Sequence, residues 1–201
     1  MKTAKLIKMY HDEIYHHFDK DKADYVAKRL VALHQTYSKE HLDAPANIKQ
    51  HYDVIFVGVA IYNAIIELGY CKEEALKLTD EIFNGVAVNV ANIIRKLLKV
   101  PGLYKLVPNL VKKMVPKKYN EASGFRFKFY DTPSNHVKFD MIACPYYAIC
   151  KEMGVPELTV IYCNNDDCCY GNMHPKLKWT RHKTIGRGDQ SCDFDIKVKE
   201  N

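Results

Sequence analysis

Residues Gly124 to Asp131, which read GFRFKFYD, decide the fold class of this chain. Phe125, Phe127 and Phe129 alternate with polar or charged residues, and a repeat of two is typical of a strand buried on one face. The residues before this stretch instead repeat apolar side chains at the spacing of three and four that a helix requires. The change of period near Asn120 therefore predicts a helical first part followed by a part that contains a sheet.

Working back from this stretch, the N-terminal portion reads as a series of helices. A helical pattern covers the first forty residues and is broken at Pro45. A second helix is predicted over Ile48 to Leu68, and a third ends near Leu98, before the turn Val100-Pro101-Gly102. We therefore predict that residues 1–120 form the helical portion.

Working forward, one more strand and two helices follow, and two further strands close the chain. VKFDMI continues the strand pattern, helices begin at Pro145 and Pro156, and LKWTRHKT and SCDFDIKV are strands joined by a hairpin turn in IGRGDQ. We predict an α+β fold, in which a helical N-terminal half packs on a C-terminal, mostly antiparallel sheet with two helices. We expect one domain over residues 1–201, with the motifs in residues 121–201.

The composition narrows the functional classes. The chain has 201 residues, of which 47% are hydrophobic, and this is enough for one domain with a sizeable core. A net charge of +6 is too mild to indicate a nucleic-acid partner. The most apolar run, VIFVGVAIYNAIIELGY, is interrupted by polar residues and predicts a buried helix rather than a membrane span. The seven cysteines and the lack of a secretory pattern lead us to expect a cytoplasmic protein with free thiols.

The segment 95–118 carries basic residues and no acidic ones, and three prolines interrupt it. One interpretation is an amphipathic segment that touches an anionic membrane. The other is a solvated connector that wraps the core. We adopt the second, because charged patches often have no partner, and we expect no membrane contact through 95–118.

Cys144 stands between VKFDMI and a helix that begins with Pro145. Proline is favoured at the first position of a helix, which places Cys144 at the N-cap or just before it. Backbone N–H groups and the helix dipole favour an anion there, so a nucleophilic thiolate is one interpretation. The alternative is a small buried thiol packed beneath the sheet, since free cysteine is commonly a core residue.

Two further cysteines and a carboxylate complete the candidate site. Cys163 and Asp166 are three residues apart on a predicted helix, so they share a face and can handle a proton or hold a metal. In SCDFDIKV, the repeat of two points Cys192 toward the helices. We therefore expect Cys144, Cys163 and Cys192 to meet beside Asp166. The alternative is that these cysteines are ordinary core residues and that Asp166 is a surface carboxylate.

Several motifs of the C-terminal half occur in a fixed order. They are Cys144-Pro145-Tyr146, Gly154-Val155-Pro156-Glu157-Leu158, Cys163 with Asp166, and the stretch from Thr184 to Phe194. In this order and spacing they resemble the L-2-amino-thiazoline-4-carboxylic acid hydrolase family, between Phe125 and Ile196. The chain departs from the family pattern at His182-Lys183 and in the additional pair Cys168-Cys169.

The resemblance implies a hydrolase that opens a small amino-thiazoline ring to an N-carbamoyl amino acid, acting on a carbon–nitrogen bond of a cyclic amidine. From residue chemistry, we expect Cys144 to attack the ring carbon and Asp166 to position water or move protons. The expected substrate-binding residues are Tyr146, Cys163, His182 and Cys192.

Two alternatives remain open at this point. In the first, Cys144, Cys163, Asp166 and Cys192 hold a divalent metal that activates water; otherwise we expect no cofactor. In the second, the chain is a non-catalytic module that binds a small ligand or a metal. The expected partner is a small molecule in each case, and the oligomeric state stays open.

Overall fold

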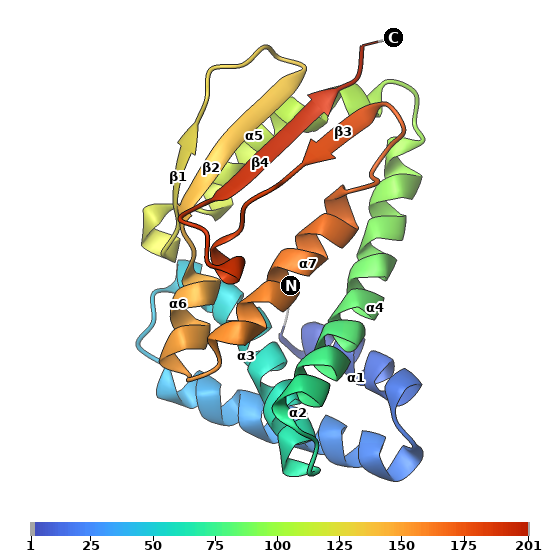
Figure 1. Ribbon diagram of the computed structural model, residues 1–201, viewed down its shortest axis with the longest axis vertical. Coiled ribbons are helices and arrows are strands. Elements are labelled where there is room, and N and C mark those ends of the chain that lie inside the picture. The colour runs from blue at the N-terminus through green and yellow to red at the C-terminus, as the bar shows by residue number, and fades with distance from the viewer. Residues whose placement is uncertain (1–2, 201) are drawn as a thin grey trace.

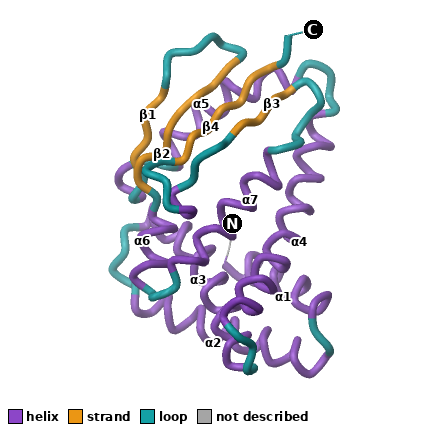
Figure 2. The backbone as a smooth tube through the Cα atoms, in the orientation of Figure 1, coloured by secondary structure: helices purple, strands orange, loops and turns teal. Residues whose placement is uncertain are grey.

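The computed structural model describes residues 3–200, apart from the side chains of residues 46 and 50, and confirms the α+β class (Figure 1). The N-terminal helices are α1 (Thr3–His17), α2 (Lys20–Glu40), α3 (Ala46–Glu67) and α4 (Lys72–Leu98), followed by α5 (Val107–Lys118). The C-terminal elements are β1 (Arg126–Phe129), β2 (His136–Ala143), α6 (Pro145–Glu152), α7 (Thr159–Tyr170), β3 (Leu177–Thr180) and β4 (Cys192–Val198). Figure 2 shows the strands gathered at one end of the molecule and α1, α2 and α3 at the other, with α4 extending between the two ends.

Local sequence signals set the ends of the N-terminal helices. Asp19 caps α2, because its side chain accepts a hydrogen bond of 3.0 Å from the backbone N–H of Lys22. This cap produces a break between α1 and α2 that the apolar pattern did not indicate. Gly69, with φ of 93°, follows α3, and Cys71 donates its N–H to Glu74 at 3.1 Å to begin α4.

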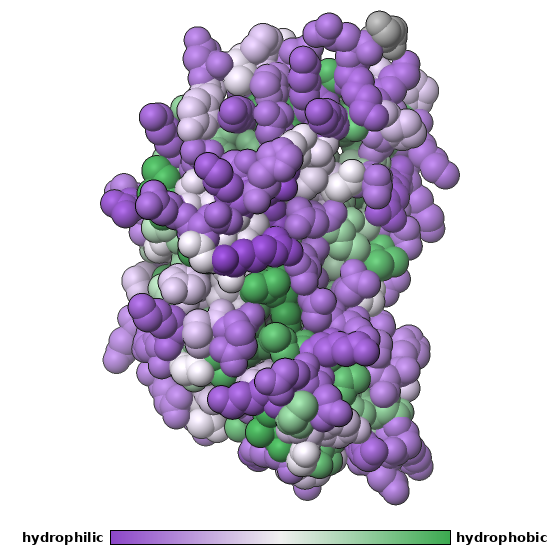
Figure 3. Space-filling model, viewed as in Figure 1, coloured by the Kyte–Doolittle hydropathy of each residue, from purple (hydrophilic) through white to green (hydrophobic). Residues whose placement is uncertain are grey.

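The outer face of the sheet is hydrophilic, and its inner face is apolar. Figure 3 looks onto the outer face, which carries exposed residues such as Lys128 and Lys138. The inner face presents Phe139 and Cys192, and the rings of Phe139 and Phe194 stack with 4.8 Å between their centroids. The alternation that predicted the strands is thus the alternation of burial.

All four strands run antiparallel, in the order β1-β2-β4-β3. α5 lies behind the sheet in Figure 1, on its inner face. The predicted hairpin turn between β3 and β4 is wrong. The two strands do pair, but residues 181–191 connect them and include the 3₁₀ turn η4 (Ile185–Arg187), which reaches α7.

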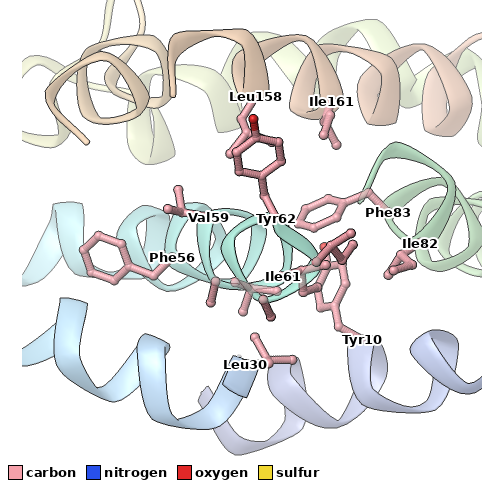
Figure 4. Close-up of a cluster of buried hydrophobic side chains, with 14 of the residues drawn as sticks. Tyr10, Leu30, Phe56, Val59, Ile61, Tyr62, Ile82, Phe83, Leu158 and Ile161 are labelled. Carbon is pink, nitrogen blue, oxygen red and sulfur yellow. The ribbon is translucent and has the colours of Figure 1, made fainter. Parts of the chain in front are cut away.

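α3 is the centre of the larger core. Ile55, Ile61 and Ile65 have no exposed surface, and a helix that is apolar around its circumference is typical of one enclosed by other helices. Figure 4 shows Phe83 of α4 and Ile161 of α7 among the side chains that surround it. The expectation of a buried helix is confirmed. Within residues 3–200, no helix combines the length and the apolarity needed to cross a bilayer.

Candidate functional site

The candidate site lies where the start of α6, the middle of α7, the chain after β3 and the start of β4 come together. Cys144 takes the N-cap position of α6 with an extended backbone, and its carbonyl accepts from Ala148 at 3.3 Å. Pro145 fills the first helical position, where its missing N–H costs nothing. The predicted position of Cys144 is confirmed.

The expected thiolate at this position is not what the fold produces. Burial raises the pKa of Cys144 to about 12, although the N–H groups of Tyr147 and Tyr146 at the start of α6 lower it. Its side chain forms no capping hydrogen bond. The cost of burying the anion therefore outweighs the helix N-terminus, and Cys144 is a protonated thiol at neutral pH.

The three thiols lie in the same region of the fold. Besides burial, both Cys192 and Cys163 raise the pKa of Cys144, so the three groups lie within electrostatic reach of one another. Burial, followed by the neighbouring Cys163, raises the pKa of Cys192 to about 11. The sulfur of Cys192 also accepts a hydrogen bond of 3.2 Å from the N–H of Ile185, which fixes it beside η4.

Cys163 lies on the face of α7 that meets η4. Burial raises the pKa of its thiol, whereas Arg181 lowers it and Asp166 raises it. A Cβ atom placed on Gly186 would lie 3.1 Å from the Cys163 sulfur and 3.0 Å from Cγ2 of Thr159. Glycine at this position therefore allows η4 to approach the helix closely enough to cover the thiol.

Asp166 has the carboxyl group with the most altered pKa in this region. Burial raises its pKa to about 6, against the lowering effect of Arg181, and Asp167 raises it further. Yet 42% of the Asp166 side-chain surface is accessible to solvent. The raised pKa and the accessible surface both fit a carboxyl group that is surrounded by protein atoms on most sides and open to water on one side. Asp166 is therefore available both to water and to a small ligand.

Arg181, which the sequence reasoning missed, is the most buried charge at the site. Its side chain is 1% exposed, with Nη1 lying 3.2 Å from Asp166 Oδ2 and Nη2 lying 2.7 Å from Asp167 Oδ2. Nη2 also donates to the carbonyl of Cys163 at 2.5 Å. Among the described residues, Nε has no hydrogen-bond partner. A buried N–H without a partner costs free energy, so the ion pairs of the other two guanidinium nitrogens offset this cost.

A signal for Arg181 was present in the sequence. In LKWTRHKT, the repeat of two places Leu177, Trp179 and Arg181 on the same side of the strand pattern. Leu177 is buried, and the guanidinium of Arg181 lies 5.8 Å from the centre of the Trp179 ring. An arginine that continues the inward-facing series indicates a buried ion pair or an anion site.

His182 lies next to Arg181, on the connection between β3 and β4. His182 is exposed, and its backbone N–H donates to Asp193 at 2.8 Å. Its contact with the substrate stays a prediction.

Tyr146 lies at the site, beneath the thiols. Burial raises its pKa well above the ordinary value, and Tyr119, Cys144 and Asp166 add to this effect. The Tyr146 hydroxyl lies 3.3 Å from Nδ1 of His51, whose pKa burial lowers. Because His51 is neutral near pH 7, Tyr146 can donate its proton to Nδ1. Sequence reasoning did not identify His51 as part of this cluster.

The metal alternative finds no support in the side-chain arrangement. Within residues 3–200, no three His, Cys, Asp or Glu side chains are placed to hold a metal ion together. Two surface hollows have volumes of about 390 and 280 Å³, and neither is lined by Cys144, Cys163, Asp166 or Cys192; Phe125 lines the first and Trp179 the second.

The comparisons with known proteins agree with the motifs. The sequence model of the L-2-amino-thiazoline-4-carboxylic acid hydrolase family matches residues 48–196, well over half of the chain. No curated protein matches it significantly. Among solved structures, the Fe(II) unliganded H-NOX protein from K. algicida has 13% identity and a TM-score of 0.40 over 100% of this chain and 98% of its own. The Fe(II)NO form of an H-NOX protein from S. oneidensis has 13% identity and a TM-score of 0.28 over 75% and 76%. TM-scores this low do not establish a common fold.

Proposed function

We propose that this chain, which belongs to the L-2-amino-thiazoline-4-carboxylic acid hydrolase family, hydrolyses a small thiazoline carboxylate or a related cyclic amidine to an N-carbamoyl amino acid. The observation that carries the proposal is the Asp166 carboxyl group, with a pKa of about 6, beside the buried cation of Arg181. A base with a pKa near the working pH combines the required protonation state with sufficient basicity. Altered pKa values of this kind are concentrated at functional sites.

In the proposed reaction, Asp166 acts as the general base. Its carboxylate takes a proton from water while the water oxygen bonds to the amidine carbon of the ring. In a thiazoline, the N-carbamoyl product then forms only if the ring carbon–sulfur bond breaks; in an all-nitrogen ring, a carbon–nitrogen bond breaks instead. Of the two water protons, one finishes on the ring nitrogen and the other on the leaving sulfur. Asp166 can deliver to that sulfur the proton that it took from water.

Arg181 is proposed to attract the negative charge of the substrate as a buried cation. Its side chain is 1% exposed and pairs with Asp166 and Asp167, so it acts through its charge and through its hold on Asp166. Arg181 also lowers the pKa of Asp166, which would otherwise be higher still. Cys144, Cys163, Cys192 and Tyr146 complete the wall of the site.

A covalent route through Cys144 is less consistent with this geometry. It needs a thiolate, but the pKa of Cys144 is about 12 and that of its candidate base Asp166 is about 6. Proton transfer from this thiol to the carboxylate is therefore strongly unfavourable. We therefore assign the attack to water.

The test compares two neighbouring carboxylates that both pair with Arg181. In Asp166→Asn we expect turnover of 2-amino-thiazoline-4-carboxylate to fall at least about a hundredfold, because the general base is lost. In the matched control Asp167→Asn we expect less than about a tenfold loss, because only the support of Arg181 weakens. Product formation is followed by mass spectrometry. Equal losses in the two variants would remove Asp166 from its role, and saturable binding by the wild type without product would favour the non-catalytic module.

Cys144→Ala separates the two routes of attack. Under the water route, this variant keeps turnover within about a tenfold range of the wild type, because it loses only a wall of the site. Abolished turnover in a folded Cys144→Ala variant, together with a substrate adduct on the wild-type protein in intact-mass spectra, would restore the covalent route.

A further inference from the structure

An exposed apolar stripe follows the outer side of α5 and of the turn before it. Leu106, Leu110 and Met114 stand four residues apart, so they share one helix face, and they are 52%, 47% and 44% exposed. The adjacent face, with Val107 and Val115, is buried in the cluster beneath the sheet. The end of α4 and the turn that follows it also expose apolar side chains, because Ile93, Leu97 and Val100 are 60%, 59% and 56% exposed.

Positive charge accompanies this stripe throughout. The segment 95–118 contains one arginine and seven lysines and no acidic residue. Arg95 is bound to Asn172 and Asn92, and Lys112 to the carbonyls of Thr132 and Pro133. Within residues 3–200, no salt bridge involves a residue of the segment. The other lysines therefore present uncompensated charge beside exposed apolar side chains.

We propose that the face formed by 93–117 docks on an anionic lipid surface. Leu110, Met114 and their neighbours enter the boundary between headgroups and acyl chains, while Lys113 and Lys117 extend to the phosphates. Each lysine close to an anionic membrane strengthens binding about fivefold at physiological salt. This reverses the expectation of a solvated connector, because the sequence did not show which apolar residues the fold would leave uncovered.

Charge and composition select lipid over a protein partner. A second copy of this chain on the same face would bring two uncompensated basic surfaces together, and like charges facing each other oppose docking. The apolar side chains of the stripe are aliphatic or methionine and the cations are mostly lysine. Protein interfaces are instead enriched in aromatic residues and arginine and depleted in lysine. Neither of these two surface hollows includes a residue of the stripe.

The experiment uses flotation of the full chain with vesicles of phosphatidylcholine alone or mixed with phosphatidylserine. We expect binding to the mixed vesicles, little to the neutral ones, and a decrease as salt rises. Leu110→Gln/Met114→Gln and Lys113→Glu/Lys117→Glu should each weaken binding at least about tenfold. The matched controls are Leu42→Gln, in the turn after α2, and Lys20→Glu/Lys28→Glu, on α2. They alter exposed residues by the same chemistry and should leave binding unchanged.

Three outcomes overturn the proposal. The first is the absence of any preference for anionic vesicles. The second is an equal loss in the control variants, which would mean that net charge alone drives the association. The third is a wild-type dimer that Leu110→Gln/Met114→Gln converts to a monomer, which would assign the face to a second copy. Circular dichroism confirms that each variant is folded.

Discussion

At the residue scale, Asp166 and Cys144 show that burial dominates the local charges of this site. Both groups have neighbours that favour the anion: Arg181 for the carboxylate and the first N–H groups of α6 for the thiol. In both, desolvation is the larger effect and raises the pKa. The carboxyl group is thereby brought near neutral pH, whereas the thiol is moved far from it.

The raised pKa of Asp166 predicts a pH dependence of activity. We expect kcat/KM to rise about tenfold per pH unit below pH 6 and to level off above it, because the general base must be ionised. The rate profile of the wild type with a thiazoline carboxylate measures this limb. A profile that stays flat between pH 4.5 and about 7 would contradict the assignment of Asp166 as the base.

The same pKa has the opposite effect on stability. The folded pKa lies above the unfolded one, so the folded state holds the proton more tightly. The contribution of Asp166 to stability is therefore fully present below about pH 4 and is lost as the pH rises through 6. Activity and stability thus change in opposite directions across this window.

At the scale of elements, the contact between η4 and α7 positions the thiols. η4 covers Cys163 through Gly186 and holds the sulfur of Cys192 through the N–H of Ile185. The two cysteines come from α7 and β4, and this short turn is the element that touches both. The position of the candidate site therefore depends on how closely η4 approaches the helix.

Gly186→Ala tests this dependence. Its methyl group would meet Cys163 and Thr159 at the edge of van der Waals contact, so we expect a loss of about 1–2 kcal/mol in unfolding free energy and a clear loss of activity. Asp19→Ala is the matched control, because loss of the α2 cap costs about 1 kcal/mol far from the site. Urea unfolding and turnover are measured for both variants. Equal activity losses would show that general destabilisation, rather than the η4 contact, is responsible.

At the scale of the whole molecule, two hydrophobic clusters are joined near the candidate site. One is built around α3 in the helical portion and the other lies beneath the sheet. Tyr146 packs against both, with its ring 5.0 Å from that of Tyr162 and 6.3 Å from that of Phe125. The site thus lies at the junction of the two clusters, where each supplies part of its wall.

This junction predicts one cooperative unfolding transition. Far-UV circular dichroism reports mainly on the helices, and the fluorescence of Trp179, the single tryptophan, reports on the sheet. We expect the two signals to coincide in urea. Tyr146→Ala should lower the unfolding free energy by about 3–5 kcal/mol and so lower the urea midpoint of both signals. Tyr146→Phe keeps the ring and should have a much smaller effect. Two separate transitions in the wild type would show that the clusters unfold independently.

Taken by itself, the sequence determined the elements and their faces. The period of apolar residues identified α3, α4 and the strands, because that period is a property of the local backbone geometry. The motifs likewise sufficed for the family, which the match over residues 48–196 confirms. Local patterns also placed Cys144 at a helix start and Cys192 on the inner face of β4.

Only the tertiary structure decided which groups are charged, which are covered and which are paired. The burial that raises the pKa of Cys144 comes from elements distant in the chain, and Arg181 finds Asp166 only after β3 and α7 pack together. The exposure of Leu110 and Met114 likewise depends on what α5 is packed against. Desolvation and pairing are sums over neighbours in space, and those neighbours are set by how the elements pack rather than by their order along the chain.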